Sequence, residues 1–351
     1  MLIEECSPLL HDVLNDSRRA GRIVDSLIGI RFQPFLERTP SAYRRSQDYW
    51  MGCFPLARLE KVQQRPSPAI IPRTTKAPTL DLETSKLHTA ALAMVGHSSL
   101  SGIQKKISVN HSADRATLQV AAAGGRYVLK PQTGTYPALP ENEHVTTQLA
   151  KLVGIEVAPN GLVSLKDGTL AYIVRRFDRL PDGRKLRQED FCQLAELPPK
   201  DKYGASTELC VKLVRKYTDE PPAELLKLYR LLLFGWWTGN GDAHLKNFSL
   251  LTGEDGITLL TPAYDLVCTR LVIPDDQLAL PLQGKKDHLR RGVWQRFADY
   301  CGLPEKVALR VLDKQAKVLD DATVLIDRSF LPDDMKKSFK QLVGERTESI
   351  R

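Results

Sequence analysis

Long apolar segments are missing from this sequence. No run of about 18 or more apolar residues occurs, and a helix that spans a membrane needs about 20. The first residues carry acidic side chains early and lack the apolar core of a secretory signal. We therefore expect a soluble cytoplasmic protein with no membrane partner, while export by a route without such a signal stays open.

Paired cysteines and clustered basic residues are missing too. The cysteines form no C-x-x-C pair, so they indicate neither a zinc site nor a disulfide framework. The formal charge is +8, yet no Lys/Arg-rich arm or zinc-finger spacing appears, and the charge alone does not indicate sequence-specific DNA binding. Buried free thiols are expected at Cys6, Cys53, Cys192, Cys210, Cys268 and Cys301.

Proline marks the clearest break in the chain. Residues 63–78 contain four prolines and no apolar periodicity, as expected of an extended linker. With 351 residues, 42% of them hydrophobic, the chain can form two domains or one two-lobed unit. We divide it into an amino-terminal extension with its linker (1–78), a small β-rich unit (79–178) and a mostly helical unit (179–351).

Apolar periodicity predicts the individual elements. Strands are expected at 127–129, 161–164, 170–174 and 257–260. One further strand is expected before residue 127. Residues 278–289 indicate a short hairpin, and residues 344–351 are expected to be frayed. Helices are predicted at 8–22, 80–95, 141–152, 185–194, 207–218, 222–238, 294–301, 304–322 and 333–343.

Residues 240–265, NGDAHLKNFSLLTGEDGITLLTPAYD, concentrate unlike polar groups in a segment that otherwise resembles buried core. Asp242 and Asn247 lie five positions apart, the D-x-x-x-x-N spacing of a protein-kinase catalytic loop, and Asp265 follows the strand at 257–260. Phosphoryl transfer needs a carboxylate for the attacking hydroxyl and hard oxygen ligands for Mg²⁺. Asp242 suits the first role, and Asn247 and Asp265 suit the second.

A lysine and an acidic residue upstream fit the same chemistry. Lys130 ends the strand at 127–129 and can reach the α- and β-phosphates of ATP, although a solvated strand-end lysine gives the same pattern. The helix at 141–152 begins with acidic residues, which suit the positive end of its dipole. Kinase-like sites use an acid from the next helix to hold the lysine. Glu143 is the natural candidate, and Glu141 is the competing choice.

Seven motifs in one order resemble a known family. They are SSLSGIQKKIS, RYVLKP, PENEHVTTQLA, RRFDR, RQEDFCQL, GNGDAHLKNFSLL and TPAYDLVCT, of which the sixth is the most specific. Together they are similar to the HipA-like kinases, the toxins of bacterial HipA/HipB-type toxin–antitoxin modules. The resemblance covers about residues 80–322, and the short chain is more similar to the HipT kind. It implies an α+β, two-lobed protein-kinase-like fold with a small β-rich N-lobe and a larger helical C-lobe.

The resemblance implies ATP and Mg²⁺ as cofactors and a role for each matching residue. Asp242 would be the catalytic base, with His244 and Lys246 positioning the γ-phosphate, while Asn247 and Asp265 would bind magnesium. Nucleotide contacts from the upstream segments would come from Lys130, Glu143, Ser101, Gly102, Gln104, Arg176 and Phe177.

The loop at 98–105 carries a further implied property. Family members autophosphorylate a serine in this loop, and the matching positions are Ser99 and Ser101. A phosphate there adds up to two negative charges beside the triphosphate site, which gives a physical basis for self-inactivation. Two departures stand out: Arg175 occupies the usual place of a hinge Glu, and the loop has only Gly102 in place of a G-x-G-x-x-G pattern.

The same resemblance implies substrates and partners. The substrate would be an aminoacyl-tRNA synthetase, phosphorylated on serine or threonine to halt translation. The partners would be a HipB-like helix-turn-helix antitoxin and a separate HipS-like subunit, with DNA reached only through the antitoxin. Two alternatives remain: a pseudokinase-like module that binds ATP and holds partners, for which Arg175 leaves room, and a small-molecule kinase, against which the loop serines stand.

Overall fold

The computed structural model describes residues 106–112, 117–121 and 124–351, which all belong to the compact unit Pro78–Arg351. The predicted helices at 8–22 and 80–95, the linker at 63–78 and the nucleotide loop at 98–105 lie outside the described residues. They stay predictions, as does the three-part division of the chain.

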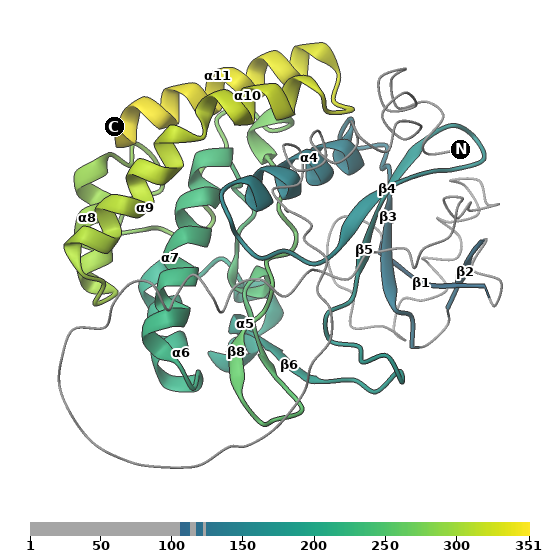
Figure 1. Cartoon of the computed structure of the whole chain (residues 1–351), viewed down its shortest axis with the longest axis horizontal. Helices are drawn as coiled ribbons and strands as arrows, with labels where there is room; N and C mark the ends of the chain where they lie inside the picture. Colours follow the sequence, from purple (N-terminus) through teal and green to yellow (C-terminus); the bar gives the residue numbers. More distant parts are fainter. Residues whose placement is uncertain (1–105, 113–116, 122–123) are drawn as a thin grey trace, which may run out of the picture. The chain divides into compact units, whose positions relative to one another are not determined.

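A five-stranded antiparallel sheet forms one part of this unit (Figure 1). Its strands are β1 (Ile107–His111), β2 (Leu118–Val120), β3 (Tyr127–Pro131), β4 (Asn160–Ser164) and β5 (Leu170–Arg175). The order is β2-β1-β3-β5-β4, so β3 lies in the middle and all of its residues are buried. The strands predicted at 127–129, 161–164 and 170–174 are confirmed.

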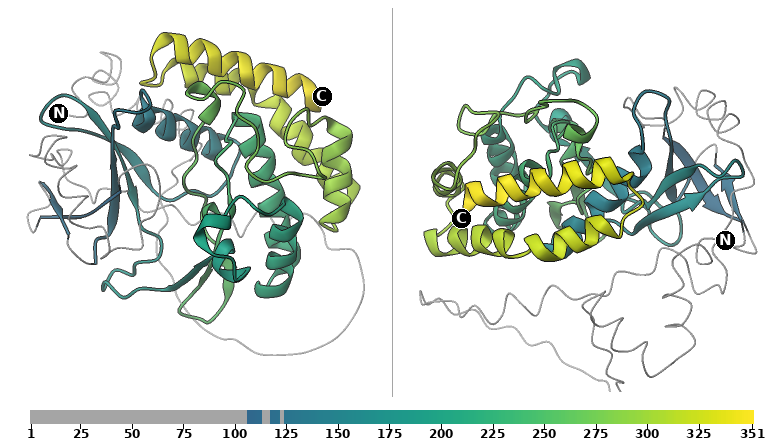
Figure 2. Two further views of the ribbon diagram at one scale, coloured as in Figure 1. Left: turned by 180° about the vertical axis from the view of Figure 1, so that it is seen from behind. Right: turned by 90° about the horizontal axis from the view of Figure 1, so that it is seen from above.

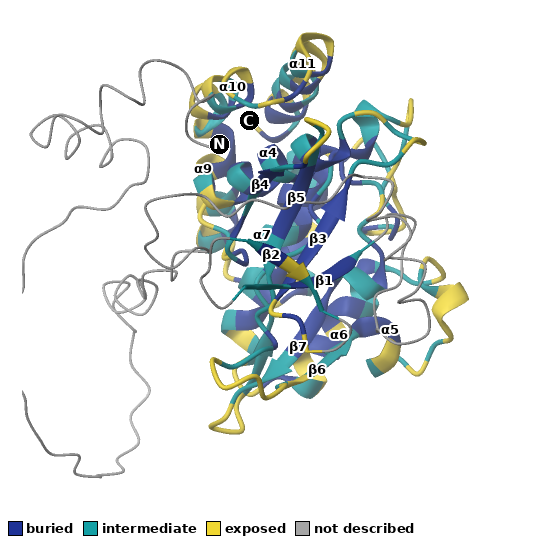
Figure 3. Ribbon diagram, turned by 90° about the vertical axis from the view of Figure 1, so that its right-hand side faces the viewer, coloured by how far each residue is buried: buried dark blue, intermediate teal, exposed yellow. Residues whose placement is uncertain are grey.

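Helix α4 (Leu139–Leu152) follows β3 and packs against β4 and β5. Pro140 lies in its first turn, where the backbone N–H groups have no intrahelical partner, and the chain leaves the helix at Gly154, whose φ is 76°. The buried face of α4 carries polar side chains, including Asn142 and Glu143. Figure 3 shows the dark blue, buried core of the sheet beside this helix.

A smaller antiparallel sheet contains β6 (Arg187–Asp190), β7 (Ser249–Thr252) and β8 (Thr258–Leu260). The strand expected at 257–260 is confirmed, but the helix expected at 185–194 is wrong. Residues 187–190 instead pair with β7, with Asp190 opposite Ser249. Only α5 (Phe191–Leu194) is helical, and it begins where the Asp190 side chain accepts a hydrogen bond of 2.9 Å from the Gln193 backbone.

The remaining elements are mostly helical, and Figure 2 shows them gathered on the side away from the five-stranded sheet. Helix α7 (Pro221–Thr238) is central, because it packs against α6 (Thr207–Tyr217) and α11 (Asp333–Ile350), and residues such as Leu228, Leu233 and Trp237 are fully buried. The helices expected at 207–218, 222–238 and 294–301 are confirmed. These elements are η2 (Pro199–Asp201), α6 (Thr207–Tyr217), α7 (Pro221–Thr238), η3 (Leu245–Asn247), η4 (Thr269–Leu271), α8 (Arg291–Tyr300), α9 (Glu305–Lys317), α10 (Leu319–Asp327) and α11 (Asp333–Ile350).

The carboxy-terminal helices correct two further predictions. The helix expected at 304–322 is two helices, α9 and α10, because the chain turns at Val318 and α10 packs against α4 and α11. Residues 344–350, expected to be frayed, continue α11. The Trp237 indole Nε1 donates a hydrogen bond of 2.9 Å to Thr347 Oγ1, and the Arg346 guanidinium lies over the Trp236 ring. Docking against α7 therefore orders this polar segment.

The described residues confirm the predicted α+β class, with a sheet-containing part and a helical part. The short hairpin expected at 278–289 is present as an isolated antiparallel bridge between Leu282 and Lys285, with a further backbone hydrogen bond from Leu278 to Lys286. In the part of the chain that the structure describes, no helix combines the length and the apolar character needed to cross a bilayer. The described cysteines are buried free thiols: Cys192, Cys210, Cys268 and Cys301.

Candidate active site

A cleft of about 570 Å³ lies where β3, α4 and β5 meet the segments 241–249 and 263–276. This volume lies in the range of small-molecule sites, which are typically about 300 to 1,000 Å³. Apolar side chains such as Val128 and Val174 line it, together with carboxylates and lysines, among which Glu143 and Lys130 are buried. The cleft brings together these predicted site residues: Lys130, Glu143, Arg176, Phe177, Asp242, His244, Lys246, Asn247 and Asp265.

Helix α7 delivers the chain into this cleft through a tight turn. Gly239 has φ 76°, and a Cβ there would lie 2.7 Å from Leu342, so the turn needs glycine. The Asn240 backbone N–H donates to Gly235 O at 2.8 Å, and its side chain accepts from the Asp242 N–H at 3.1 Å. A Cβ at Gly241 would meet the Asp276 carboxylate at 2.0 Å. Both glycines therefore set the position of Asp242.

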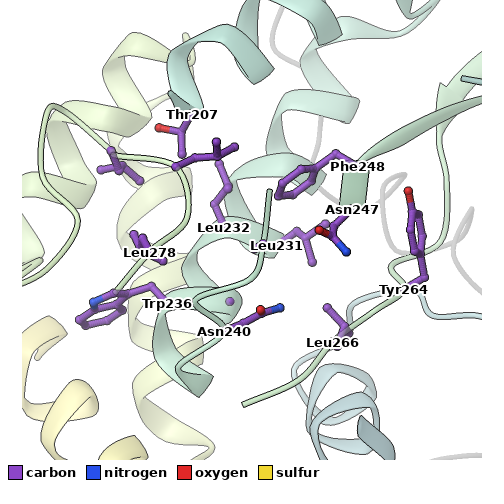
Figure 4. A pocket seen from close by; sticks show the side chains of 14 residues that line it. Thr207, Leu231, Leu232, Trp236, Asn240, Asn247, Phe248, Tyr264, Leu266 and Leu278 are labelled. Carbon is purple, nitrogen blue, oxygen red and sulfur yellow. The ribbon is translucent and has the colours of Figure 1, made fainter. Parts of the chain in front are cut away.

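A second, apolar pocket backs the same turn (Figure 4). Leu231, Leu232 and Trp236 of α7 line it together with Phe248, while Asn240 and Asn247 border it from the turn. The figure shows both asparagine side chains on the side of the pocket opposite Leu278 and Thr207. Apolar packing thus supports the turn on one side, while its carboxylate, Asp242, lines the cleft.

Asp265 is the centre of a buried ionic cluster. Its backbone has φ 54°, a left-handed conformation that costs energy for a non-glycine residue and persists only where the surroundings impose it. Lys106 Nζ donates to its Oδ2 at 2.9 Å, and Lys130 Nζ donates to its Oδ1. Burial disfavours the charged carboxylate, yet the two lysines outweigh burial and hold the pKa of Asp265 well below its usual range.

Lys130 also contacts an acidic residue of α4. Its Nζ lies 2.5 Å from Glu143 Oε1, whereas Glu143 Oε2 is buried and has no hydrogen-bond partner among the residues that the structure describes. Burial opposes the lysine charge, but Asp265 and Glu143 outweigh it and raise the pKa of Lys130. Burial raises the pKa of Glu143, against the effect of Lys130. Of the two acids considered, Glu143 is thus the one that touches the lysine.

Asn247 completes the link between the turn and Asp265. Its Nδ2 donates to Asp265 Oδ2 at 3.3 Å, and its Oδ1 accepts from the His244 backbone N–H at 3.2 Å. The two side chains proposed as magnesium ligands therefore lie side by side. Mg²⁺ is usually held by one or two carboxylates together with substrate phosphates and water. The Asp265 carboxylate and the Asn247 side-chain oxygen are donors of this kind, although here the oxygen accepts from His244 and the amide nitrogen faces Asp265.

Asp242 lies at the open end of the cleft, with its side chain 51% exposed. The Tyr203 hydroxyl donates to its Oδ1 at 2.5 Å, and His244 Nε2 lies 3.9 Å from the same oxygen. His244 is itself buried, and burial lowers its pKa although the Asp242 charge acts the other way. The imidazole is therefore neutral near pH 7.

Lys246 points to a different partner within the cleft. Its Nζ lies 2.6 Å from Asp190 Oδ2, so the Asp190 carboxylate both caps α5 and holds this lysine. The backbone of Lys246 is fixed as well, because the Tyr264 hydroxyl donates to its carbonyl oxygen at 2.9 Å. A role for Lys246 at the γ-phosphate stays a prediction.

The segment after β5 lies against the cleft. Arg176 donates twice to the Asp178 carboxylate, at 2.8 and 2.7 Å, and Arg179 donates to it at 2.9 Å. Burial opposes ionisation of Asp178, but the two arginines outweigh it and lower its pKa. The Phe177 ring packs beside Tyr264, with ring centroids 5.7 Å apart. The hinge is thus a fixed turn with one aromatic face toward the cleft.

Four predicted site residues lie outside the described residues, so their roles stay predictions: Ser99, Ser101, Gly102 and Gln104.

The sequence analysis missed three residues of the cleft: Lys106, Asp190 and Tyr203. Lys106 lies near the end of the motif SSLSGIQKKIS, and Asp190 lies in the motif RQEDFCQL, so both motifs held a signal. Tyr203 carried none, because nothing in its neighbourhood shows that it meets Asp242.

A family model described as the HipA-like C-terminal domain matches residues 98–323, which is well over half of this 351-residue chain. The match contains every cleft residue discussed above.

Curated proteins of the same kind are similar at modest identity. The chain is 32% identical over 271 residues to Y4mE of Sinorhizobium fredii, whose name marks it as a candidate kinase, covering 72% of this chain and 63% of that protein. It is 30% identical over 226 residues to a Haemophilus influenzae protein with the same designation, covering 58% and 64%. It is 28% identical over 247 residues to the serine/threonine-protein kinase toxin HipA of Shewanella oneidensis, covering 64% and 56%. The chain thus spans less than two thirds of their lengths.

Solved structures agree on the fold. A chain in the complex of Shewanella oneidensis HipA, HipB and operator DNA is similar with a TM-score of 0.62 and 23% identity, covering 81% of this chain and 74% of that chain. The Helicobacter pylori proinflammatory kinase CtkA is similar with a TM-score of 0.50 and 15% identity, covering 69% and 90%. The fold predicted from the sequence is therefore the one observed.

Proposed function

This chain belongs to the family of the HipA-like C-terminal domain, and on that premise we propose that it is an ATP- and Mg²⁺-dependent serine/threonine protein kinase. One observation carries the proposal. A lysine held by a helix carboxylate, an Asp–Asn pair and a separate exposed aspartate converge on one cleft. Phosphoryl transfer is largely a matter of positioning and charge stabilisation, and these are the groups it uses.

The buried end of the cleft would bind the triphosphate. Lys106 and Lys130 supply two ammonium groups, and Glu143 keeps Lys130 aligned along the cleft wall. Asn247 and Asp265 would hold Mg²⁺, which supplies positive charge to the phosphates when it is bound. The adenine would lie against the apolar wall formed by Val128, Val174 and Phe177.

The open end would carry out the proton transfer. Asp242 faces the cleft with its carboxylate half exposed, so a hydroxyl of a protein substrate can reach it. The oxygen of that hydroxyl would form a bond to the γ-phosphorus, the bond from phosphorus to ADP would break, and Asp242 would take the proton. Neutral His244 packs beside Asp242 and limits its movement.

The substrate and partners follow from the relatives alone. The HipA toxin of Shewanella oneidensis is named as a serine/threonine-protein kinase, and a similar chain occurs in a complex with HipB and operator DNA. We extend this to an aminoacyl-tRNA synthetase as protein substrate, a HipB-like antitoxin and a HipS-like subunit as partners, and autophosphorylation at Ser99 or Ser101. These extensions depend on the family, since no described residue selects a substrate.

The test is phosphate incorporation, followed by mass spectrometry of the purified protein after incubation with ATP and Mg²⁺. We expect phosphate on Ser99 or Ser101 in the wild type and none in Asp242→Ala. Asp320→Ala is the matched control, because Asp320 is an exposed aspartate on α10 outside the cleft. It should incorporate phosphate like the wild type.

Two results would redirect the proposal. If the wild type binds ATP but neither incorporates nor transfers phosphate, the ATP-binding module replaces the kinase. If the wild type phosphorylates small metabolites and no protein, the chain is a small-molecule kinase and not a protein kinase. Incorporation that survives Asp242→Ala would instead remove Asp242 from the role of base.

A further inference from the structure

Tyr203 makes an unusual contact for an exposed aromatic residue. The residue is 42% exposed and lines the cleft, yet its hydroxyl donates a hydrogen bond of 2.5 Å to Asp242 Oδ1. The edge of the ring packs against His244, with centroids 5.0 Å apart, and Lys202 Nζ lies 4.9 Å from the ring centre. Tyr203 therefore approaches the proposed base from the solvent side.

The backbone around Tyr203 is tied to the same loop as the base. The Leu245 N–H donates to Lys202 O at 3.2 Å, and Gly204 N–H closes the turn onto Asp201 O at 2.8 Å. The side chain is less constrained than the backbone, because Tyr203 is 42% exposed and its ring packs on one edge against His244. The hydroxyl can thus leave Asp242 by a side-chain rotation while the turn stays in place.

The hydroxyl of Tyr203 has the chemistry of a phosphate acceptor. An acceptor hydroxyl must donate to the Asp242 carboxylate before its oxygen attacks phosphorus, and Tyr203 already makes this donation. Burial and the Asp242 carboxylate raise the pKa of Tyr203, so its hydroxyl keeps its proton and remains a donor. While this bond is made, Oδ1 of Asp242 is occupied by the Tyr203 hydroxyl.

We propose that Tyr203 occupies the acceptor subsite of this cleft and is displaced by the hydroxyl side chain of the protein substrate. While no substrate is bound, the Tyr203 hydroxyl occupies Asp242 Oδ1, so a water molecule that attacks ATP has to compete with it for this oxygen. In the reaction that it suppresses, a water oxygen bonds to the γ-phosphorus, the bond from phosphorus to ADP breaks, and Asp242 takes the proton. The inference rests on the proposed kinase function. It adds where the acceptor hydroxyl binds and how hydrolysis of ATP by water is suppressed.

The first test measures ADP release from ATP and Mg²⁺ with no protein acceptor. Tyr203→Phe removes one hydroxyl and keeps the ring packing, and it should raise the rate about tenfold, the effect of losing one hydrogen bond to a charged group. Tyr217→Phe is a matched control, because Lys216 Nζ lies 4.6 Å from the Tyr217 ring centre and Tyr217 lies outside the cleft lining. It should leave the rate unchanged.

The double variant Tyr203→Phe with Asp242→Ala shows whether the increase passes through the base. It should hydrolyse ATP no faster than Asp242→Ala alone. An increase that persists without Asp242, or a rate in Tyr203→Phe equal to or below that of the wild type, would overturn the assignment.

The second test needs no catalytic activity. Tetranitromethane nitrates accessible tyrosines through their ionised form, and peptide mass spectrometry locates the nitro groups. Asp242→Ala should increase nitration of Tyr203 relative to the wild type, with Tyr217 as the internal standard. Unchanged nitration would contradict the contact in solution.

The two tests separate this inference from the function beneath it. If Tyr203 is nitrated less in the wild type than in Asp242→Ala, but the protein neither hydrolyses ATP nor transfers phosphate, the proposed kinase function is wrong, and the acceptor subsite with it. If the protein is an active kinase, but Tyr203→Phe does not release ADP faster or Asp242→Ala does not increase nitration of Tyr203, only the role of Tyr203 is wrong.

Discussion

The two ends of the cleft hold their charges in different ways. At the end nearest the sheet, the Lys130 side chain is 5% exposed and touches both Glu143 and Asp265. At the other end, Asp242 is half exposed, and its carboxylate is engaged by a tyrosine that faces solvent. Charges out of water need a partner, whereas hydrated charges can exchange partners at little cost. The closed end is therefore built to keep its ionisation state, and the open end to change contacts.

This difference divides the expected effects of mutation. At the closed end, removal of one charge leaves its partner unpaired in a buried place, so stability and ATP binding should fall together. At the open end, the same removal leaves no buried charge, and only turnover should change. Each prediction below either sharpens this division or breaks it.

The largest effect is expected for Asp265→Ala. The change removes a proposed Mg²⁺ ligand, takes the carboxylate away from Lys106 and leaves Lys130 with Glu143 alone. Phosphoryl transfer should fall by about a thousandfold or more, and the free energy of unfolding by about 3 kcal/mol. Rates of ADP release and chemical denaturation followed by circular dichroism measure the two quantities.

Asp275→Ala is the control for this prediction. Asp275 shares the positive φ, 56° against 54° for Asp265, but its side chain is 97% exposed. It reproduces the backbone change without the buried charges, and should cost neither activity nor much stability. Were Asp265→Ala to unfold at the same denaturant concentration as the wild type, the cluster would not be an ionic unit.

A smaller effect is expected for Glu143→Gln. Glutamine keeps the shape of the side chain but not its charge, so Lys130 loses one of its two carboxylates. The KM for ATP should rise about tenfold, as measured by initial rates at varied ATP concentrations. Glu141→Gln is the matched control, because residues two positions apart on a helix face nearly opposite sides. A similar rise in both variants would show a general effect of charge on α4.

Local patterns were sufficient where the interacting residues are close in sequence. The five-residue spacing of Asp242 and Asn247 places both on one short loop, and Asp265 follows directly from β8. The pairing of Lys130 with an acid of the next helix was predictable for the same reason, since α4 follows β3 after a short turn. The choice between Glu141 and Glu143 needed the helical phase that the structure supplies.

Patterns failed where a distant segment decides the structure. Residues 187–190 have a sequence compatible with a helix, but β7 lies about 60 positions later and supplies the hydrogen bonds that make them a strand. The polar end of α11 is ordered by Trp237, and Lys106 gains its role from Asp265, 159 positions away. Tyr203 reaches Asp242 across 39 positions. None of these contacts leaves a periodic signal in one sequence.

The smallest effect concerns pH, and it tests a residue that belongs to both ends. His244 lies beside the exposed Asp242 but is itself buried, and burial lowers its pKa below the usual value of about 6.5. Below that pH the unfolded chain binds a proton that the folded chain refuses, so the free energy of unfolding should fall as the pH falls. In His244→Gln the free energy of unfolding should fall less between about pH 8 and pH 5, where the ordinary imidazole titrates, as measured by denaturation curves at each pH.

His288→Gln controls for loss of one surface imidazole, since that side chain is 93% exposed, and its free energy of unfolding should follow the wild type. If His244→Gln declines as steeply as the wild type, the imidazole accepts its proton in the folded state, and the open end controls the charge of His244 despite its burial.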